Sequence, residues 1–232
     1  MIPGGLSIRA KPDLMRPCQL HTWDLSPTEA IAVQLQLRDQ VIRCDDFGEI
    51  KTVAGADLGI RGSLATAVIS VLSYPSLVLV DQSVVKTAVQ FPYIPGLLSF
   101  REIPPLLQAF DQLRTMPDLI ILDGHGVAHP RRFGLASHLG LILDWPTIGC
   151  AKSRLFGTYQ EPELEKGSYR FLHDRDQNVI GAAVRTRSQT KVVFVSTGHR
   201  VSLDSAVRLT LACCPRYKLP ETTRYAHRLA SN

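Results

Sequence analysis

The fold is indicated most directly by residues 50–90, which read IKTVAGADLGIRGSLATAVISVLSYPSLVLVDQSVVKTAVQ. They divide into three runs rich in Val, Ile and Thr, namely Ile50–Ile60, Ala65–Leu72 and Leu77–Gln90. Two short breaks, Arg61-Gly62-Ser63 and Ser73-Tyr74-Pro75-Ser76, separate these runs. Branched residues between turn sequences are typical of β-strands, and short connections favour antiparallel pairing. The stretch therefore predicts three antiparallel strands.

After residue 90, helix-like segments alternate with short apolar runs. The segments predicted as helices are Leu97–Leu113, about Phe133–Leu143 and Ser202–Cys213, and those predicted as buried strands are Leu119–Leu122, Thr147–Cys150 and Lys191–Ser196. Another helix precedes the antiparallel strands: Ser26, Pro27 and Glu29 form its capping signature, and its end is predicted near Cys44–Gly48. This order predicts an α/β fold, a ribonuclease H-like mixed sheet in which three antiparallel strands are followed by parallel strands, with helices on both faces. Other mixed α/β topologies share the same coarse order.

Length and composition indicate an ordinary globular protein. The chain has 232 residues, of which 45% are hydrophobic and 20% charged. We expect one catalytic domain over residues 25–232, preceded by an N-terminal extension of uncertain order at residues 1–24. The five cysteines include no C-x-x-C pair, which argues against a zinc site or a disulfide framework and fits a reducing cytosol. No apolar stretch is long enough to span a membrane, so we expect a cytoplasmic monomer.

The charge distribution favours an anionic partner. The formal net charge is +5. Between Val184 and Arg228 there are nine Lys or Arg residues, opposed only by Asp204 and Glu221. Such a segment is typical of nucleic-acid binding, although a solvated basic face has the same composition.

Three carboxylates are candidates for a metal site. Asp57 lies inside the first strand run, Asp123 directly follows the apolar run Leu119–Leu122, and Glu102 lies in the helix-like segment between them. A carboxylate in or after a core strand is costly to desolvate unless it is paired, hydrogen-bonded or bound to a cation. Mg²⁺ prefers oxygen ligands, and Lys152, which follows another short strand, could offset charge on a phosphate. Taken alone, Asp123-Gly124 could equally be a turn.

Longer motifs in this chain resemble the endonuclease V family. They are FPYIPGLLSFRE at residues 91–102, DGHGVAHPRRFGLASHLG at residues 123–140 and PTIGCAKS at residues 146–153. The resemblance extends from about Leu25 to the C-terminus. It implies a ribonuclease H-like DNA repair enzyme that uses Mg²⁺, with Mn²⁺ able to substitute. Such an enzyme hydrolyses the second phosphodiester bond 3′ to deoxyinosine, whose base is hypoxanthine, and leaves 3′-hydroxyl and 5′-phosphate ends.

The resemblance also implies roles for individual residues. Asp57 and Asp123 would hold the metal, with Glu102 completing the set directly or through water. Lys152 would contact the phosphate near the cut, and His227 would help to position water or metal. The remaining implied positions are a wedge that enters the duplex (Tyr93, Ile94, Pro95), a pocket for the flipped-out base (Gly96, Leu98, Gly124, Leu155) and phosphate contacts (His129, Arg131).

The residues leave alternatives open. In isolation, the Pro-Tyr-Ile-Pro-Gly sequence predicts a rigid turn that packs Tyr93 into the core, and His129 could structure its loop instead of contacting phosphate. At the level of function, the alternatives are an endoribonuclease specific for inosine in RNA, a more general nuclease acting on branched or mismatched structures, and a non-catalytic protein that binds the lesion and recruits another nuclease. The 2′-hydroxyl distinguishes RNA from DNA, and no residue of this sequence is identified as its reader.

Overall fold

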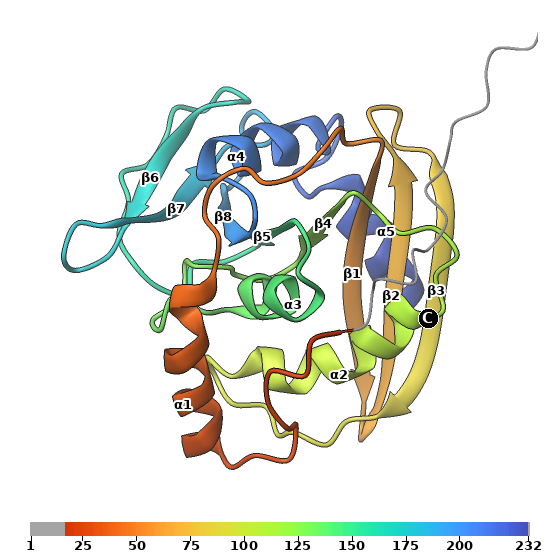
Figure 1. Ribbon diagram of the computed structural model, residues 1–232. Coiled ribbons are helices and arrows are strands. Elements are labelled where there is room, and N and C mark those ends of the chain that lie inside the picture. Colours follow the sequence, from red (N-terminus) through yellow and green to blue (C-terminus); the bar gives the residue numbers. More distant parts are fainter. Residues whose placement is uncertain (1–16, 232) are drawn as a thin grey trace, which may run out of the picture.

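A computed structural model describes residues 17–231 of the chain, which form one eight-stranded mixed sheet with helices on both faces (Figure 1). The strands are β1 (Thr52–Arg61), β2 (Leu64–Ser73), β3 (Leu79–Ala88), β4 (Leu119–Leu122), β5 (Thr147–Ala151), β6 (Tyr169–His173), β7 (Val179–Val184) and β8 (Val193–His199). The helices are α1 (Pro27–Leu37), the 3₁₀ turn η1 (Arg38–Gln40), α2 (Leu98–Asp111), α3 (Leu135–Leu143), α4 (Leu203–Ala212) and α5 (Glu221–Ala230). The order of strands across the sheet is β3-β2-β1-β4-β5-β8-β7-β6.

The pairing of the strands confirms the mixed sheet. β1, β2 and β3 form the predicted antiparallel meander, and β4 and β5 continue it in parallel with β1. A parallel strand is predicted at Lys191–Ser196, but β8 at this position is antiparallel to β5. The chain reaches β8 through the successive antiparallel strands β6 and β7, and not through the crossover helix that usually joins parallel neighbours. Parallel pairing is therefore confined to β1, β4 and β5.

Alternating side chains of the central strands supply two separate cores. In β4, Ile120 and Leu122 pack with α2 and α3, whereas Leu119 and Ile121 pack with α4. This is the period of two expected of a strand covered on both faces. The prediction of helices on both faces is confirmed, and the central strands are held rigidly between two apolar layers.

Helix α5 lies unusually close to β1. A side chain at Gly55 would overlap the backbone of Thr222, and one at Gly59 would overlap the backbone of Ala230. Because these two β1 positions carry no side chain, the helix can settle directly on the strand. This helix is absent from the sequence-based predictions, as are β6 and β7.

The N-terminal helix begins as predicted and ends earlier. Ser26 and Glu29 form the full capping box of α1, but regular structure stops at Gln40 rather than near Cys44–Gly48. Its buried face contains Ala30, Gln34 and Leu37. Leu35, which fits the apolar helical spacing, is instead 44% exposed. The buried face of α1 therefore contains the polar side chain of Gln34, whereas the apolar side chain of Leu35 faces outward.

Part of the predicted N-terminal extension is packed against the domain. In residues 17–24, the backbone N–H of Cys18 donates to the carbonyl of Ile142 at 2.8 Å, and Trp23 packs against two of the apolar cores. The other residues of the extension, 1–16, lie outside the described part. Across residues 17–231, none of the helices combines the length and the apolar character needed to cross a membrane.

Candidate active site

Strand register places two of the predicted carboxylates side by side. The parallel pairing of β1 with β4 reaches Ala56 and Leu122, and Asp57 and Asp123 are the next residue of each strand. Neighbouring strands lie about 4.8 Å apart, so these two side chains begin from adjacent backbone positions. Both carboxylates stay in contact with solvent, since their side chains are 18% and 19% exposed.

Glu102 brings a third carboxylate from α2, the helix that packs beneath these strands. Its pKa is raised to about 8, first by burial and then by the negative charges of Asp57 and Asp123. Arg101 opposes this shift. Negative charges shift a pKa in this way only when they lie close to the carboxyl group. The three predicted ligands are therefore close together.

Two basic side chains face the carboxylates. The ammonium group of Lys152, which directly follows β5, lies 2.5 Å from Asp123 Oδ2. On α5, Nδ1 of His227 lies 2.7 Å from Asp57 Oδ2. Burial nevertheless raises the pKa of Asp123, even though Lys152 acts in the opposite direction. All five residues predicted to act in catalysis therefore meet at one end of the sheet, from β1, α2, the ends of β4 and β5, and α5.

The donor set suits a hard divalent cation. Within residues 17–231, no three His, Cys, Asp or Glu side chains are already arranged as a complete ligand group. Lys152 and His227 hold one oxygen each of Asp123 and Asp57. Burial is the main cause of the raised pKa of Glu102, and the negative charges of Asp57 and Asp123 add to it despite these two partners. Carboxylate oxygens with unbalanced charge are what Mg²⁺ and similar cations bind, so the residues fit such an ion.

A cavity of about 230 Å³ adjoins the carboxylates. Its lining includes all the residues predicted for the wedge and the base pocket: Tyr93, Ile94, Pro95, Gly96, Leu98, Gly124 and Leu155. Tyr93 is 69% exposed, so the alternative that this side chain is buried in the core is wrong. The structure thus brings the predicted wedge and pocket positions together, next to Asp123 and Lys152. Their roles remain predictions.

One carbonyl oxygen holds the loop that carries the wedge. Gly96, whose φ of 81° favours glycine, accepts hydrogen bonds from Gln34 Nε2 at 3.0 Å, His129 Nε2 at 3.0 Å and Arg131 at 2.8 Å. The same Gln34 Nε2 also donates to the carbonyl of Phe133 at 2.9 Å, and its Oε1 accepts from Arg131 Nε at 2.5 Å. We call Gln34, His129 and Arg131 the loop clamp.

The loop clamp changes the interpretation of two predicted phosphate contacts. His129 is only 3% exposed, and its pKa is lowered to about 3, mainly by burial and next by Arg131. A neutral, buried imidazole does not attract a phosphate, so the alternative in which His129 structures the loop fits better. Two N–H groups of the Arg131 side chain donate within the clamp, to Gln34 Oε1 and to the Gly96 carbonyl. Both residues therefore hold the loop that carries the wedge, and their contact with phosphate stays a prediction.

Gln34 and His125 are pocket residues that the sequence predictions do not include. Gln34 is 1% exposed and joins α1 to two loops. Its only sequence signal is a polar side chain at helical spacing between Ala30 and Leu37. His125 also lines the cavity, and its buried Nε2 has no hydrogen-bond partner among the described residues. Burial lowers the pKa of His125 to about 4. The imidazole is therefore neutral and has an unused nitrogen.

Comparisons with known proteins agree with this site. The sequence profile of the family described as Endonuclease V matches residues 35–228. An endonuclease V from a Roseiflexus species is 51% identical over 210 residues, covering 90% of this chain and 94% of the relative. The crystal structure of endonuclease V from Streptomyces avermitilis superposes with a TM-score of 0.85 at 45% identity, over 90% of this chain and 93% of that one.

A second similar structure contains nucleic acid. It is a D234N variant of endonuclease V from Ciona intestinalis in complex with a 23mer DNA containing an inosine followed by a ribo-adenosine. It is 30% identical to this chain, with a TM-score of 0.79, and covers 89% of this chain and 97% of its own. The similarity therefore extends over most of this chain and almost all of that one.

Proposed function

We propose, because the chain belongs to the endonuclease V family, that it is a metal-dependent endonuclease that recognises deoxyinosine in DNA. It hydrolyses the second phosphodiester bond 3′ to the lesion and leaves 3′-hydroxyl and 5′-phosphate ends. The observation that carries the proposal is the gathering of Asp57, Glu102 and Asp123 with Lys152 and His227 beside the cavity behind Tyr93.

The three carboxylates would hold the cation, which we propose to be Mg²⁺, with Mn²⁺ as a substitute. When bound, such an ion polarises a phosphate and lowers the pKa of a water molecule. Lys152 is placed to exchange its contact with Asp123 for a contact with the scissile phosphate, where its charge offsets the charge that develops on the phosphoryl oxygens. His227 fixes the orientation of Asp57 through their hydrogen bond. In this proposal Lys152 acts on the phosphate, whereas His227 acts on the metal ligand Asp57.

The cavity is suited to a single flipped-out base. Pro92 and Pro95 fix φ in the loop that contains Tyr93, and the loop clamp fixes its end at Gly96. A stiff loop with an exposed aromatic side chain can enter a base stack with little further loss of entropy. Unstacking a base costs a few kcal/mol, least where the pair is already weak, as a hypoxanthine pair is. The Nε2 of His125, which has no hydrogen-bond partner among the described residues, is a group of the cavity lining that could hydrogen-bond to the base.

A cleavage assay tests this proposal. End-labelled DNA strands with one central inosine, and matched strands with adenosine, are incubated with the purified chain and Mg²⁺, Mn²⁺ or EDTA. We expect a cut directly 3′ of the nucleotide that follows inosine, at the second phosphodiester bond, with either metal but not with EDTA. If the adenosine strand is cut equally well, recognition of inosine is wrong. If the chain binds the inosine strand but does not cut it, the result would favour the alternative of a non-catalytic protein that binds the lesion and recruits another nuclease.

RNA is the second candidate substrate. The observation in its favour is the ribo-adenosine that follows inosine in the nucleic acid bound to the Ciona intestinalis relative. Inosine-containing RNA strands of the same sequence belong in the same assay. Faster cleavage of RNA at equal enzyme concentration would assign this chain as an inosine-specific endoribonuclease, and faster cleavage of DNA would retain the repair function.

A further inference from the structure

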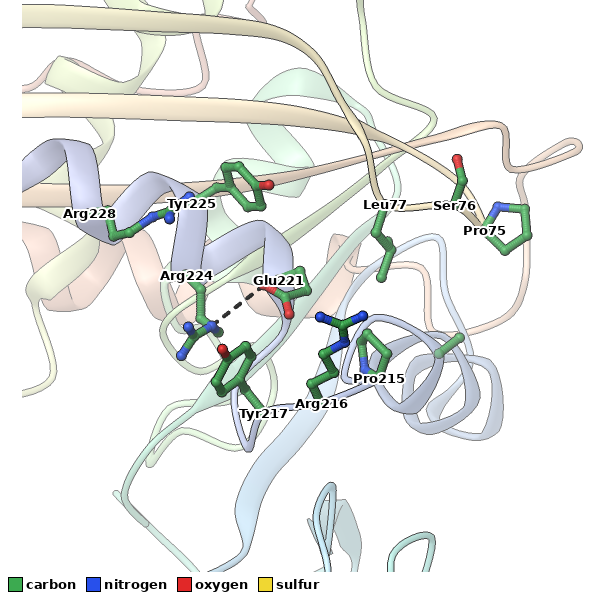
Figure 2. Close-up of a pocket in the computed structure, with 11 residues that line it drawn as sticks. Pro75, Ser76, Leu77, Pro215, Arg216, Tyr217, Glu221, Arg224, Tyr225 and Arg228 are labelled. Carbon is green, nitrogen blue, oxygen red and sulfur yellow. Dashed lines mark ion pairs between the residues drawn. The ribbon is translucent and has the colours of Figure 1, made fainter.

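A second, larger cavity of about 490 Å³ lies between α5, the segment that precedes it and the turn that joins β2 to β3 (Figure 2). Three arginines line it, Arg216, Arg224 and Arg228, together with Tyr217 and Tyr225. We call it the arginine cavity. Figure 2 shows Arg216 extending into the space below Leu77, while Arg224 and Arg228 come from α5. None of these residues belongs to the candidate active site.

The arginine cavity carries excess positive charge in a defined geometry. Its one acidic side chain is Glu221, so three guanidinium groups face a single carboxylate. The guanidinium of Arg224 lies 3.4 Å from the ring centre of Tyr217, and that of Arg228 lies 4.5 Å from the ring centre of Tyr225. Stacking on a ring holds a guanidinium in place and leaves the N–H groups at its edge available. Such edges match the two oxygens of a phosphate.

Arg224 also has an unused donor. Its Nε is buried and lies 3.5 Å from Glu221 Oε2, yet it makes no hydrogen bond among the described residues. A buried donor that makes no hydrogen bond is unfavourable, because it has given up its hydrogen bond to water. An anion that enters the arginine cavity would allow the guanidinium to shift and satisfy this donor. The cavity is therefore incomplete in its hydrogen bonding as well as in its charge.

Helix α5 contributes residues to both the arginine cavity and the active site. On this helix, His227 and Arg228 lie three and four residues after Arg224, which is the spacing of neighbours on a helix surface. A rise of 1.5 Å per residue places Arg224 about one helical turn from His227, which contacts Asp57. Consecutive nucleotides of a strand are separated by a few ångströms, about 3.4 Å in a duplex. A strand that leaves the active site along α5 therefore reaches the cavity within a few nucleotides.

We infer that the arginine cavity binds the phosphodiester backbone of the substrate strand on one side of the cleavage site. This inference rests on the proposed function, because it requires a nucleic-acid strand in the active site. The contact is with phosphate and not with bases, so it adds affinity without adding sequence preference. It makes binding depend on how far the strand extends beyond the lesion and on salt concentration.

The test measures binding without cleavage. A fluorescent single strand with a central inosine, long enough to extend past α5 in both directions, is titrated with the full chain in EDTA at several salt concentrations. The variant is Arg216→Gln with Arg228→Gln, two exposed side chains, so that the fold is retained. We expect affinity to fall about tenfold and the slope of log affinity against log salt to become shallower by about 1.4, or about 0.7 for each lost phosphate contact.

A matched control removes the same charge elsewhere. Arg114→Gln with Arg175→Gln changes two exposed arginines far from α5 and should leave the slope of the wild type unchanged. An inosine strand too short to leave the active site should bind the wild type and the cavity variant equally. The inference is overturned if the cavity variant keeps the wild-type slope, or if the control variant loses as much slope. The proposed function fails separately, if the wild-type chain neither prefers nor cuts inosine.

Discussion

The two halves of the candidate active site are built in different ways. The chemical half consists of charged side chains in or directly after central strands and on the helices α2 and α5, and Asp57 and Asp123 occupy adjacent positions because β1 and β4 are paired. The recognition half is the loop that carries Tyr93, fixed by three side chains that donate to the single carbonyl of Gly96. Backbone pairing thus positions the reacting groups, whereas buried side-chain hydrogen bonds position the wedge.

This difference has a consequence for mutation. A substitution at a strand end removes a reacting group but leaves the sheet in place, so cleavage is lost and binding is kept. A substitution in the loop clamp leaves the carboxylates in place and loosens the loop, so discrimination is lost while the chemical centre stays intact. The two halves should therefore fail independently, because within residues 17–231 no hydrogen bond joins the loop clamp to the three carboxylates.

The largest effect is expected at the chemical half. Asp123→Asn removes one of three charges that would hold the cation, while a side chain of the same shape remains. We expect single-turnover cleavage of inosine-containing DNA to fall on the order of 1000-fold or more. Binding of the same strand in EDTA should stay within a few-fold of wild type. Cleavage at the wild-type rate would remove Asp123 from the reaction.

The next effect tests how α5 is held. Gly55→Ala places a side chain against the backbone of Thr222, and forcing the helix away should lower the free energy of unfolding by about 1–3 kcal/mol. It should also weaken cleavage, since His227 moves with the helix away from Asp57. Urea denaturation and the cleavage rate measure the two effects. Gly48→Ala is the control, because nothing lies near that position, and it should change stability by less than about 0.5 kcal/mol. Equal stability of the two variants would contradict the close packing.

A smaller effect is expected at the recognition half. Gln34→Ala removes one donor from Gly96 and leaves the buried carbonyl of Phe133 without that partner. We expect the preference for inosine over adenosine, measured as a ratio of kcat/KM values, to fall about tenfold, roughly the 1–3 kcal/mol of one lost buried hydrogen bond. Gln36→Ala, on the exposed side of the same helix, is the control and should behave as wild type. An unchanged preference in Gln34→Ala would show that the loop does not need the clamp.

The smallest effect is a pH dependence of folding stability. It arises from His138, which lies next to the wall of the cavity in the recognition half. His138 is fully buried, its Nδ1 lies 3.0 Å from Ser99 Oγ in the cavity wall, and its Nε2 lies 2.7 Å from His21 Nε2. Burial, followed by the charge of His21, lowers the pKa of His138 well below its usual value. The unfolded chain therefore binds this proton more readily than the folded one. Stability is present above about pH 6.5 and is lost as pH falls below it, by about 1.4 kcal/mol for the first pH unit.

Urea denaturation of the wild type and of His138→Asn between pH 7.5 and pH 5 measures this dependence. The variant should be less stable at neutral pH but should lose less stability on acidification. An identical slope of unfolding free energy against pH in both proteins would show that His138 is not the responsible group. The slope is the deciding quantity, because the absolute stability also reflects lost packing around the imidazole.

Sequence patterns identify the chemical half more completely than the recognition half. Asp57 and Asp123 can be found because a charged residue inside or directly after an apolar strand stands out, and the parallel register then brings the two together. Gln34 cannot be found in this way. A glutamine in a helix is ordinarily exposed, and its partners Gly96 and Phe133 lie 62 and 99 residues away in the chain.

The elements missing from the sequence-based predictions lack a clear apolar period. The buried face of α5 consists of Thr222, Thr223, Ala226 and Ala230, which are small or polar because the helix lies directly on the glycines of β1. In β6, Tyr169 and Phe171 are exposed, at the outer edge of the sheet. Contacts of this kind become recognisable only when the partner surface is known.

The measurement that tests the central claim most directly is a paired comparison of Asp123→Asn and Gln34→Ala. For each variant, the single-turnover cleavage rate at saturating enzyme with Mg²⁺ is set beside the ratio of affinities for inosine and adenosine strands in EDTA. We predict that Asp123→Asn loses the cleavage rate and keeps the affinity ratio, and that Gln34→Ala keeps most of the rate and loses the ratio. If each variant loses both quantities to the same extent, the two halves of the site are not separate.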